Sequence, residues 1–121
     1  MRFSILFLLM LPIAAEADTK IFSCEYSSYS DEKGHHKNID IKKQAIFVDE
    51  DDEIASLMVD GETYDYQLVI SGDRVIFYQV TNDGSFNSIT IDKNMDVVYS
   101  RNTLQDGLLA PSQYYGKCSA K

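Results

Sequence analysis

The stretch VDGETYDYQLVISGD (residues 59–73) contains a complete predicted β-strand between two turns. Apolar or aromatic residues occupy every second position from Tyr64 to Ile70, and the positions between them hold Asp, Gln and Val. A period of two is typical of a strand that buries one face. Asp60-Gly61 precedes the strand, and glycine accepts the positive φ that tight hairpin turns require. The pattern predicts an antiparallel strand over residues 63–70.

Turn signals of the same kind recur through the middle of the chain. They fall at residues 49–53, 59–62, 70–73, 81–85 and 92–96. Their centres are about 10 or 11 residues apart, as expected for short strands joined by tight turns. The segments between them are rich in β-branched and aromatic residues, and no segment keeps a helical period. Six consecutive strands are predicted, near residues 44–48, 54–59, 63–70, 74–80, 85–91 and 95–100.

Each end of the chain adds one predicted strand that carries one of the two cysteines. The segments are KIFSCEY (residues 20–26) and YYGKC (residues 114–118), and in each the cysteine shares a face with aromatic or small residues. A bond between Cys24 and Cys118 requires Cα atoms within about 7 Å, so the first and last strands must be neighbours. Such a bond would stabilise the domain by roughly 4 to 5 kcal/mol. A metal pair and an intermolecular bond are the alternatives.

These features predict an all-β fold, a small antiparallel meander of about eight strands whose first and last strands are tied by a disulfide. The sheet is expected to close into an up-and-down barrel or to form a flattened sandwich, and closure would remove its exposed edges. Two connections differ from the tight turns. Residues 27–38 are expected to form a polar loop. Residues 101–113 are expected to form a longer connection, in which one helical turn covers an end of the barrel and Pro111 ends it.

The first 17 residues, MRFSILFLLMLPIAAEA, have the composition of a secretory signal peptide. Arg2 precedes an apolar run too short to span a bilayer, and residues 15–17 match an A-x-A cleavage site. A buried N-terminal helix or strand is the alternative interpretation. We therefore expect residues 18–121 to form a single β-barrel-like domain, exported to the periplasm or secreted. Export would place both cysteines in an oxidising compartment, where they pair.

The chain is acidic, with 19 acidic and 11 basic residues and a net charge of −8. Negative charge opposes binding to nucleic acid and to anionic lipid. No second long apolar segment follows residue 17, so we expect no membrane span in the mature protein, and we expect a monomer. No G-x-S-x-G, H-E-x-x-H or phosphate-binding glycine loop occurs. The sequence therefore predicts a protein without enzymatic activity, cofactor or metal.

The most polar feature of the sequence is an acidic run in one of the expected turns. Its members are Asp49, Glu50, Asp51, Asp52 and Glu53. An EF-hand is excluded, because its sixth position requires glycine and Ile54 stands there. A solvated turn, a loose calcium site and a patch for a basic protein partner remain as interpretations, and complementary charge would speed encounter with such a partner.

Tyrosines and histidines supply the other candidate contact residues. Tyr29, Tyr78 and Tyr115 lie outside the predicted core face and are candidates for contact with a protein partner, because tyrosine suits interfaces. The two histidines of the chain, His35 and His36, are adjacent. In an extended segment they would point to opposite faces and could not share a metal ion, whereas in a loop a nearby carboxylate could complete a site with them.

The segments FSCEY (residues 22–26) and YGKC (residues 115–118), together with the acidic charge, resemble the layout of the periplasmic inhibitors of lysozyme. Members of that family are small exported β-barrels tied by a cysteine bond, and they block a basic enzyme. The resemblance implies the same architecture here. The Ser-x-Gly-x-x-Tyr inhibitory stretch of that family has no match in this chain, so no residue role is carried over.

Three functions fit these features. The first is a binding module, such as an inhibitor, that acts on a basic secreted protein through surface loops. The second is a carrier barrel for a small apolar ligand. Eight strands leave an interior just wide enough for side chains or one small ligand, and the bulky Tyr, Phe and Ile residues on the core face predict a filled interior. The third is a structural protein of the cell envelope.

Overall fold

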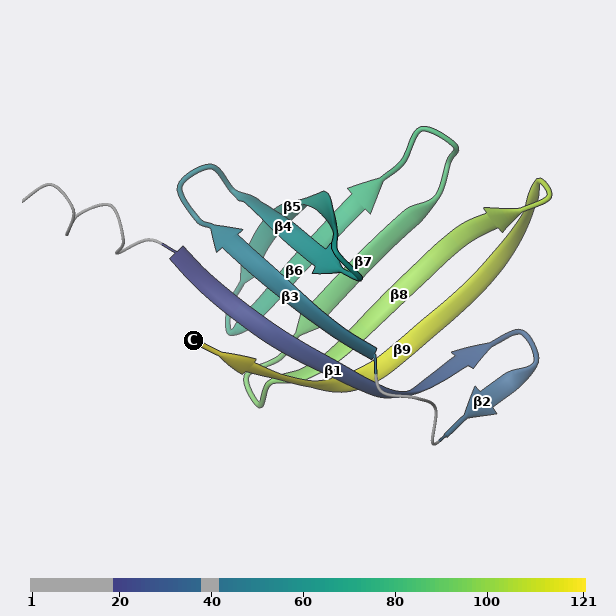
Figure 1. Cartoon of the computed structure of the whole chain (residues 1–121), viewed down its shortest axis with the longest axis horizontal. Helices are drawn as coiled ribbons and strands as arrows, with labels where there is room; N and C mark the ends of the chain where they lie inside the picture. Colours follow the sequence, from purple (N-terminus) through teal and green to yellow (C-terminus); the bar gives the residue numbers. More distant parts are fainter. Residues whose placement is uncertain (1–18, 38–41) are drawn as a thin grey trace, which may run out of the picture.

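The computed structural model describes residues 19–37 and 42–121, and this part of the chain forms nine β-strands and no helix. Eight of the strands form a closed antiparallel barrel, which confirms the predicted all-β meander (Figure 1). The predicted signal peptide lies outside the described residues. No helix in the described part is long and apolar enough to cross a membrane.

The barrel follows the order of the chain. From β3 to β9 every strand pairs with the next, and β1 closes the sheet by pairing with β3 on one side and β9 on the other. The short β2 forms a hairpin with the far end of β1 and lies outside the closed barrel. The strands are β1 (Thr19–Asp31), β2 (Gly34–His36), β3 (Lys42–Asp49), β4 (Ile54–Val59), β5 (Glu62–Ser71), β6 (Arg74–Val80), β7 (Phe86–Ile91), β8 (Asp96–Gln105) and β9 (Leu108–Ala120).

The connection predicted at residues 101–113 is wrong, because no helical turn forms there. Strand β8 continues to Gln105 and β9 begins at Leu108, so the two strands form one long hairpin. The cause is Asp106-Gly107, where φ is 54° and 80°. Two consecutive positive φ angles are the geometry of a two-residue hairpin turn, which lets the residues on both sides continue the ladder.

The polar loop predicted at residues 27–38 is also largely strand. Strand β1 runs on to Asp31, because its second half pairs with the extended β9, where Ser30 lies opposite Gln113 and Asp31 opposite Ser112. The register between β1 and β9 shifts between Tyr26 and Ser28, which marks a β-bulge. Residues 38–41 lie outside the described residues.

The predicted disulfide is present and joins the two strands that close the barrel. Cys24 and Cys118 lie directly opposite each other in the β1–β9 ladder, 94 residues apart in the sequence. Both belong to the apolar core or pack against it. A disulfide is consistent with an oxidising, exported location.

The barrel interior changes character from one end to the other. At the end that carries the turns 49–53, 72–73 and 92–95, hereafter the closed end, inward-facing apolar side chains fill the space. These are Phe22, Cys24, Ile46, Val48, Ala55, Leu68, Phe77, Ile89, Ile91 and Val97. Toward the turns 60–61, 81–85 and 106–107, hereafter the open end, the inward positions hold Tyr, Asn, Gln, Arg and Thr. The expectation of a filled interior is therefore wrong for the open half.

Candidate functional site

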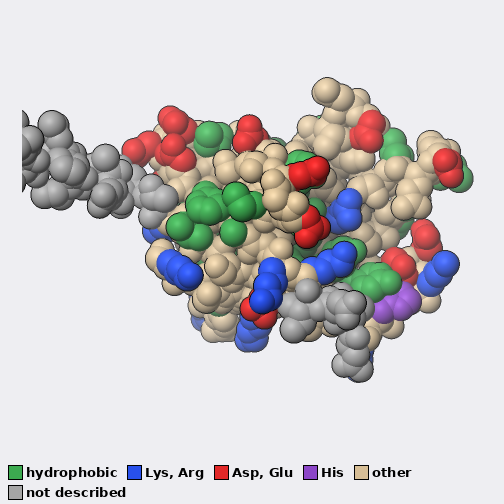
Figure 2. All heavy atoms as spheres, viewed as in Figure 1, with side chains coloured by type: hydrophobic (Ala, Val, Ile, Leu, Met, Phe, Trp, Pro, Cys, Tyr) green, Lys and Arg blue, Asp and Glu red, His purple; other side chains and the backbone are tan. Residues whose placement is uncertain are grey.

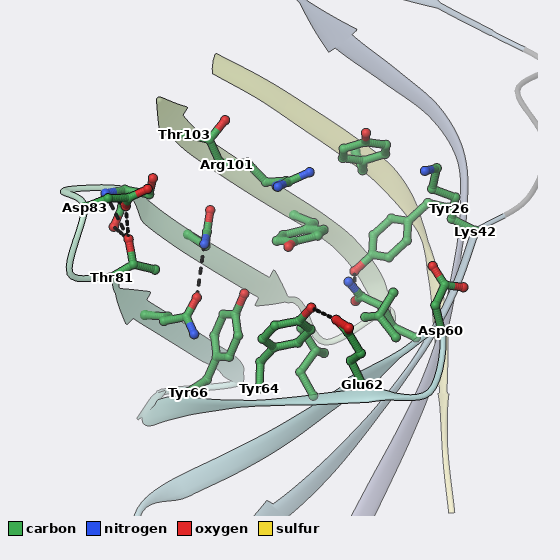
Figure 3. A pocket seen from close by; sticks show the side chains of 18 of the residues that line it. Tyr26, Lys42, Asp60, Glu62, Tyr64, Tyr66, Thr81, Asp83, Arg101 and Thr103 are labelled. Atoms are coloured by element: carbon green, nitrogen blue, oxygen red, sulfur yellow. Dashed lines mark hydrogen bonds between the residues drawn. The ribbon is translucent and has the colours of Figure 1, made fainter. Parts of the chain in front are cut away.

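A cavity of about 680 Å³ occupies the open half of the barrel (Figure 3). Pockets for small molecules and cofactors typically measure about 300–1,000 Å³ and combine apolar walls with a few polar groups. Five tyrosines from four strands form much of the wall: Tyr26, Tyr64, Tyr66, Tyr99 and Tyr114. The inward positions at this end of the barrel thus enclose a space of the size that a small ligand needs.

The deepest tyrosines are fixed by packing and by one hydrogen bond. Tyr26 is 1% exposed, and its hydroxyl donates a hydrogen bond of 2.7 Å to Oε1 of Gln44. The ring of Tyr26 lies 5.9 Å from that of Tyr99 and 6.2 Å from that of Tyr114, in tilted and edge-on arrangements that aromatic pairs prefer. Burial raises the pKa of Tyr26 and of Tyr66, so both hydroxyls stay neutral at physiological pH.

The rim of the cavity is more polar. Tyr64 is 41% exposed, and its hydroxyl donates a hydrogen bond to Oε2 of Glu62, which raises the pKa of Tyr64. Lys42 lies on the opposite side, with its ammonium 5.8 Å from the centre of the Tyr114 ring. Figure 3 shows the side chains of Tyr64 and Tyr66 on one wall and that of Arg101 on the facing wall. Aromatic surfaces and charged groups therefore meet at the entrance.

Two side-chain amides in the cavity wall, those of Gln79 and Asn87, are linked by a hydrogen bond. Gln79 donates from Nε2 to the backbone carbonyl of Asp65 at 3.4 Å, and its Oε1 accepts from Nδ2 of Asn87 at 3.1 Å. Asn87 is only 7% exposed, and its Oδ1 is buried without a hydrogen-bond partner. Buried polar groups are nearly always paired, so this oxygen is a candidate acceptor for a hydrogen bond from a bound molecule.

Arg101 is the second residue with an unpartnered atom in the cavity. Its Nε is buried without a hydrogen-bond partner, and its guanidinium carbon lies 5.9 Å from the centre of the Tyr99 ring. The register of β7 and β8 places Arg101 directly opposite Asn87. The two unpartnered atoms of the site thus come from neighbouring residues on one inner wall.

The acidic run lies far from this cavity, in the exposed turn between β3 and β4 at the closed end. Figure 2 shows acidic side chains gathered over this turn, at the left of the molecule. Glu50 pairs with Lys20 at 3.2 Å, and Asp49 accepts a hydrogen bond from the backbone of Asp52 at 3.2 Å. In the described part of the chain, no group of three or more His, Cys, Asp and Glu side chains is arranged to hold a metal ion.

The three tyrosines predicted as candidates for contact with a protein partner do not form one patch. Tyr78 faces outward from β6 and stacks on Phe86, with ring centres 6.3 Å apart. Tyr29 stacks on Tyr114, its cross-strand neighbour, with ring centres 5.3 Å apart, so it packs beside a residue that lines the cavity. Tyr115 donates a hydrogen bond to Ser30 at 3.3 Å on the other face of β9.

The two histidines lie on opposite faces of the β1–β2 hairpin. His36 stacks on Tyr29 and lies 3.0 Å from Oδ1 of Asp31. His35 contacts Ser30 at 2.9 Å and has its ring 5.7 Å from that of Tyr115. The hydrogen bond with His36 is the main cause of the lowered pKa of Asp31.

The polar residues of the cavity are absent from the candidate residues predicted from the sequence. Asn87 shares its face with Ile89 and Ile91, so the period of two already placed it inward. Arg101 continues the face of Val97 and Tyr99, but it fell within the supposed connection after residue 100. A polar residue in phase with a core face is the signal that could have found both.

No protein-family model matches this chain, and no curated protein matches it. Its function is therefore inferred from the geometry and chemistry of the cavity.

Proposed function

We propose that this protein is an exported binding protein that holds a small molecule in the cavity at the open end of its barrel. The observation that carries this proposal is a cavity of about 680 Å³ whose lining includes Asn87 and Arg101, two residues that each hold a buried polar atom without a partner, Oδ1 and Nε respectively. Leaving a buried polar atom unpaired costs about 1–3 kcal/mol. A ligand that supplied the missing partners would recover this free energy on binding.

The composition of the cavity supports ligand binding without catalysis. Among the described residues that line it, none is histidine or cysteine. Two of the three carboxylates among these lining residues are engaged locally, since Glu62 accepts from Tyr64 and Asp83 accepts from Thr81 and Ser85; the third belongs to Asp60. Nucleophilic catalysis needs an activated nucleophile beside a base, and the lining offers no such pair.

The disulfide and the expected signal peptide support an exported location for this binding protein. The bond between Cys24 and Cys118 is consistent with an oxidising compartment, where disulfides form and persist. Residues 1–17 have the pattern of a cleavable signal peptide. These two features together support binding of the small molecule in the periplasm or outside the cell.

Native mass spectrometry of the protein, exported with its own signal and purified gently, is expected to show a small added mass. The variant Thr103→Trp should lose it, because Thr103 lines the cavity and an indole would occupy part of the space (Figure 3). The matched control is Thr90→Trp, since Thr90 alternates with the buried Ile89 and Ile91 and faces outward. Wild-type protein that is bare and takes up nothing from a small-molecule extract would contradict the proposal.

A second candidate function is binding of a basic protein through the acidic turn. Its support is an exposed apolar patch on the outer faces of β3 and β4 beside that turn, where Phe47, Ile54 and Met58 are 37%, 37% and 41% exposed. Figure 2 shows hydrophobic side chains gathered over these two strands. An apolar centre with a charged rim is the usual anatomy of a protein interface.

In this second function, neutralising the turn should slow association. We expect the double variant Asp52→Asn, Glu53→Gln to lower the association rate with a basic secreted protein by about tenfold at low salt, and much less at high salt. Surface plasmon resonance against a panel of such proteins measures this, with Asp73→Asn in the neighbouring exposed turn as the control. Equal rates for the double variant and the wild type would exclude the turn as the contact surface.

A further inference from the structure

The two unpartnered atoms belong to neighbouring residues of the cavity lining, Arg101 and Asn87. The two residues are direct cross-strand neighbours of β7 and β8 on the inward face. In an antiparallel pair the Cβ atoms of such neighbours lie about 5 Å apart. A small group bound against this pair would meet an N–H donor on one side and a carbonyl acceptor on the other.

The hydrogen-bond character of Asn87 is fixed by the amide chain behind it. The carbonyl of Asp65 can only accept, so Gln79 must donate to it with Nε2 and is left with Oε1 to accept from Asn87. Asn87 therefore donates with Nδ2, and its Oδ1 is left as a buried acceptor without a partner on a residue that lines the cavity. The ligand must present a hydroxyl or N–H group at this point.

Among the described residues, no carboxylate forms an ion pair with Arg101. In the described ranges, the ion pairs engage other cations, namely Lys20, His36 and Lys117. Of the mature chain's two arginines, Arg74 is exposed at the closed end and Arg101 alone lines the cavity. A partly buried guanidinium without a carboxylate is costly, and its fork of N–H donors matches a carboxylate.

We propose that the ligand of the cavity is a small organic anion whose carboxylate is bound by Arg101 and whose adjacent hydroxyl or N–H donates to Oδ1 of Asn87. This proposal rests on the proposed small-molecule function. The body of the ligand would lie against the tyrosine rings of Tyr64, Tyr66 and Tyr99, which offer flat apolar surface with polar tips. The class is therefore an aromatic acid with a hydrogen-bond donor next to its acidic group.

Three related compounds separate the contributions of the carboxylate and of the adjacent hydroxyl to the binding affinity. Mandelate carries a phenyl ring, a carboxylate and an adjacent hydroxyl. Phenylacetate lacks the hydroxyl, and 1-phenylethane-1,2-diol replaces the carboxylate by a neutral alcohol. Calorimetry with the oxidised, exported protein gives the affinities, and chemical-shift changes at the backbone amides locate the binding. We expect mandelate to bind with millimolar affinity or better, and both analogues to bind about tenfold more weakly.

Two arginine variants test the role of Arg101. Arg101→Met should remove the preference for mandelate over the diol, while Arg74→Met, which removes the same charge from the closed end, should leave it unchanged. A purely structural role predicts that Arg101→Met lowers the melting temperature. We expect that temperature to stay equal or to rise, because an apolar side chain replaces a partly buried charge that has no ion-pair partner.

Three results would overturn the inference: equal binding of mandelate and the diol, unchanged mandelate affinity in Arg101→Met, or no mandelate binding to the wild type. In the third case, a neutral compound found in the cavity by native mass spectrometry and shift mapping would support the proposed small-molecule binding and contradict only the anionic ligand. A cavity that holds neither mandelate nor any natural compound would remove both proposals.

Discussion

Replacing Gly116 by alanine is expected to lower the free energy of unfolding by about 3 kcal/mol or more. A Cβ atom at this position would lie 1.9 Å from the backbone oxygen of Glu25 and 2.8 Å from Cα of Tyr26. The obstacle is backbone, so no side-chain rotation can relieve it. The bulge of β1 between Tyr26 and Ser28 brings the two closing strands together at this point, and alanine would push them apart.

The control for Gly116→Ala is Gly61→Ala. Gly61 sits in the β4–β5 turn with φ of 81°, and an alanine methyl group there would have no atom within 4 Å, so the substitution adds only backbone strain of about 1 kcal/mol. Urea unfolding followed by circular dichroism compares the two variants. Equal losses would mean that β1 and β9 separate easily, and the close approach at Gly116 would not be what holds the barrel shut.

The barrel itself was largely predictable from the sequence, because the residue types at its turns indicate where each strand ends. Asp60-Gly61 adopts two positive φ angles, 51° and 81°, as a two-residue hairpin requires. The six predicted central strands match β3 to β8, although β8 continues five residues further than expected. The predicted bond between the two cysteines then made neighbours of the first and last strands, which left a closed barrel or a flattened sandwich, and the structure shows the closed barrel.

The cavity was not predictable in the same way. It depends on whether the inward-facing side chains at a given height along the barrel axis together fill the interior. A period of two shows which residues point inward, but not whether they reach the axis. At the closed end Phe22 and Phe77 meet at 6.2 Å between ring centres and fill the interior. At the open end Tyr64 and Arg101 lie on facing walls with the cavity between them (Figure 3). Only the register of all the strands distinguishes these cases.

The two ends of the barrel therefore serve different purposes. The closed half buries aliphatic and aromatic side chains, which supply most of the free energy of folding. The open half contains an unfilled volume, an unpaired guanidinium and an unpaired amide oxygen, all of which lower stability. A domain of this size has only about 5–15 kcal/mol of stability, so such a site needs a strong constraint elsewhere.

The disulfide is that constraint, and reducing it is expected to lower the free energy of unfolding by about 4–5 kcal/mol. The bond closes a segment of 94 residues, so its loss frees nearly the whole chain in the unfolded state. Urea unfolding with and without a thiol reductant measures the change, and the described residues contain no other cysteine for the reductant to affect. The unfolding slope should also increase, because an unfolded chain without a cross-link exposes more surface.

The double variant Cys24→Ala, Cys118→Ala is the control for effects of the reductant itself, and it should lose at least as much stability as the reduced protein. Both cysteines lie toward the closed end of the barrel, whereas the cavity lies at the open end. Reduction should therefore leave the ligand affinity of each folded molecule nearly unchanged while it lowers the folded fraction. A loss of stability below about 1 kcal/mol would show that the unfolded chain is already compact without the bond. An affinity that fell with reduction would instead mean that the closing strands β1 and β9, which also carry Tyr26 and Tyr114, hold the cavity in shape only while they are tied together.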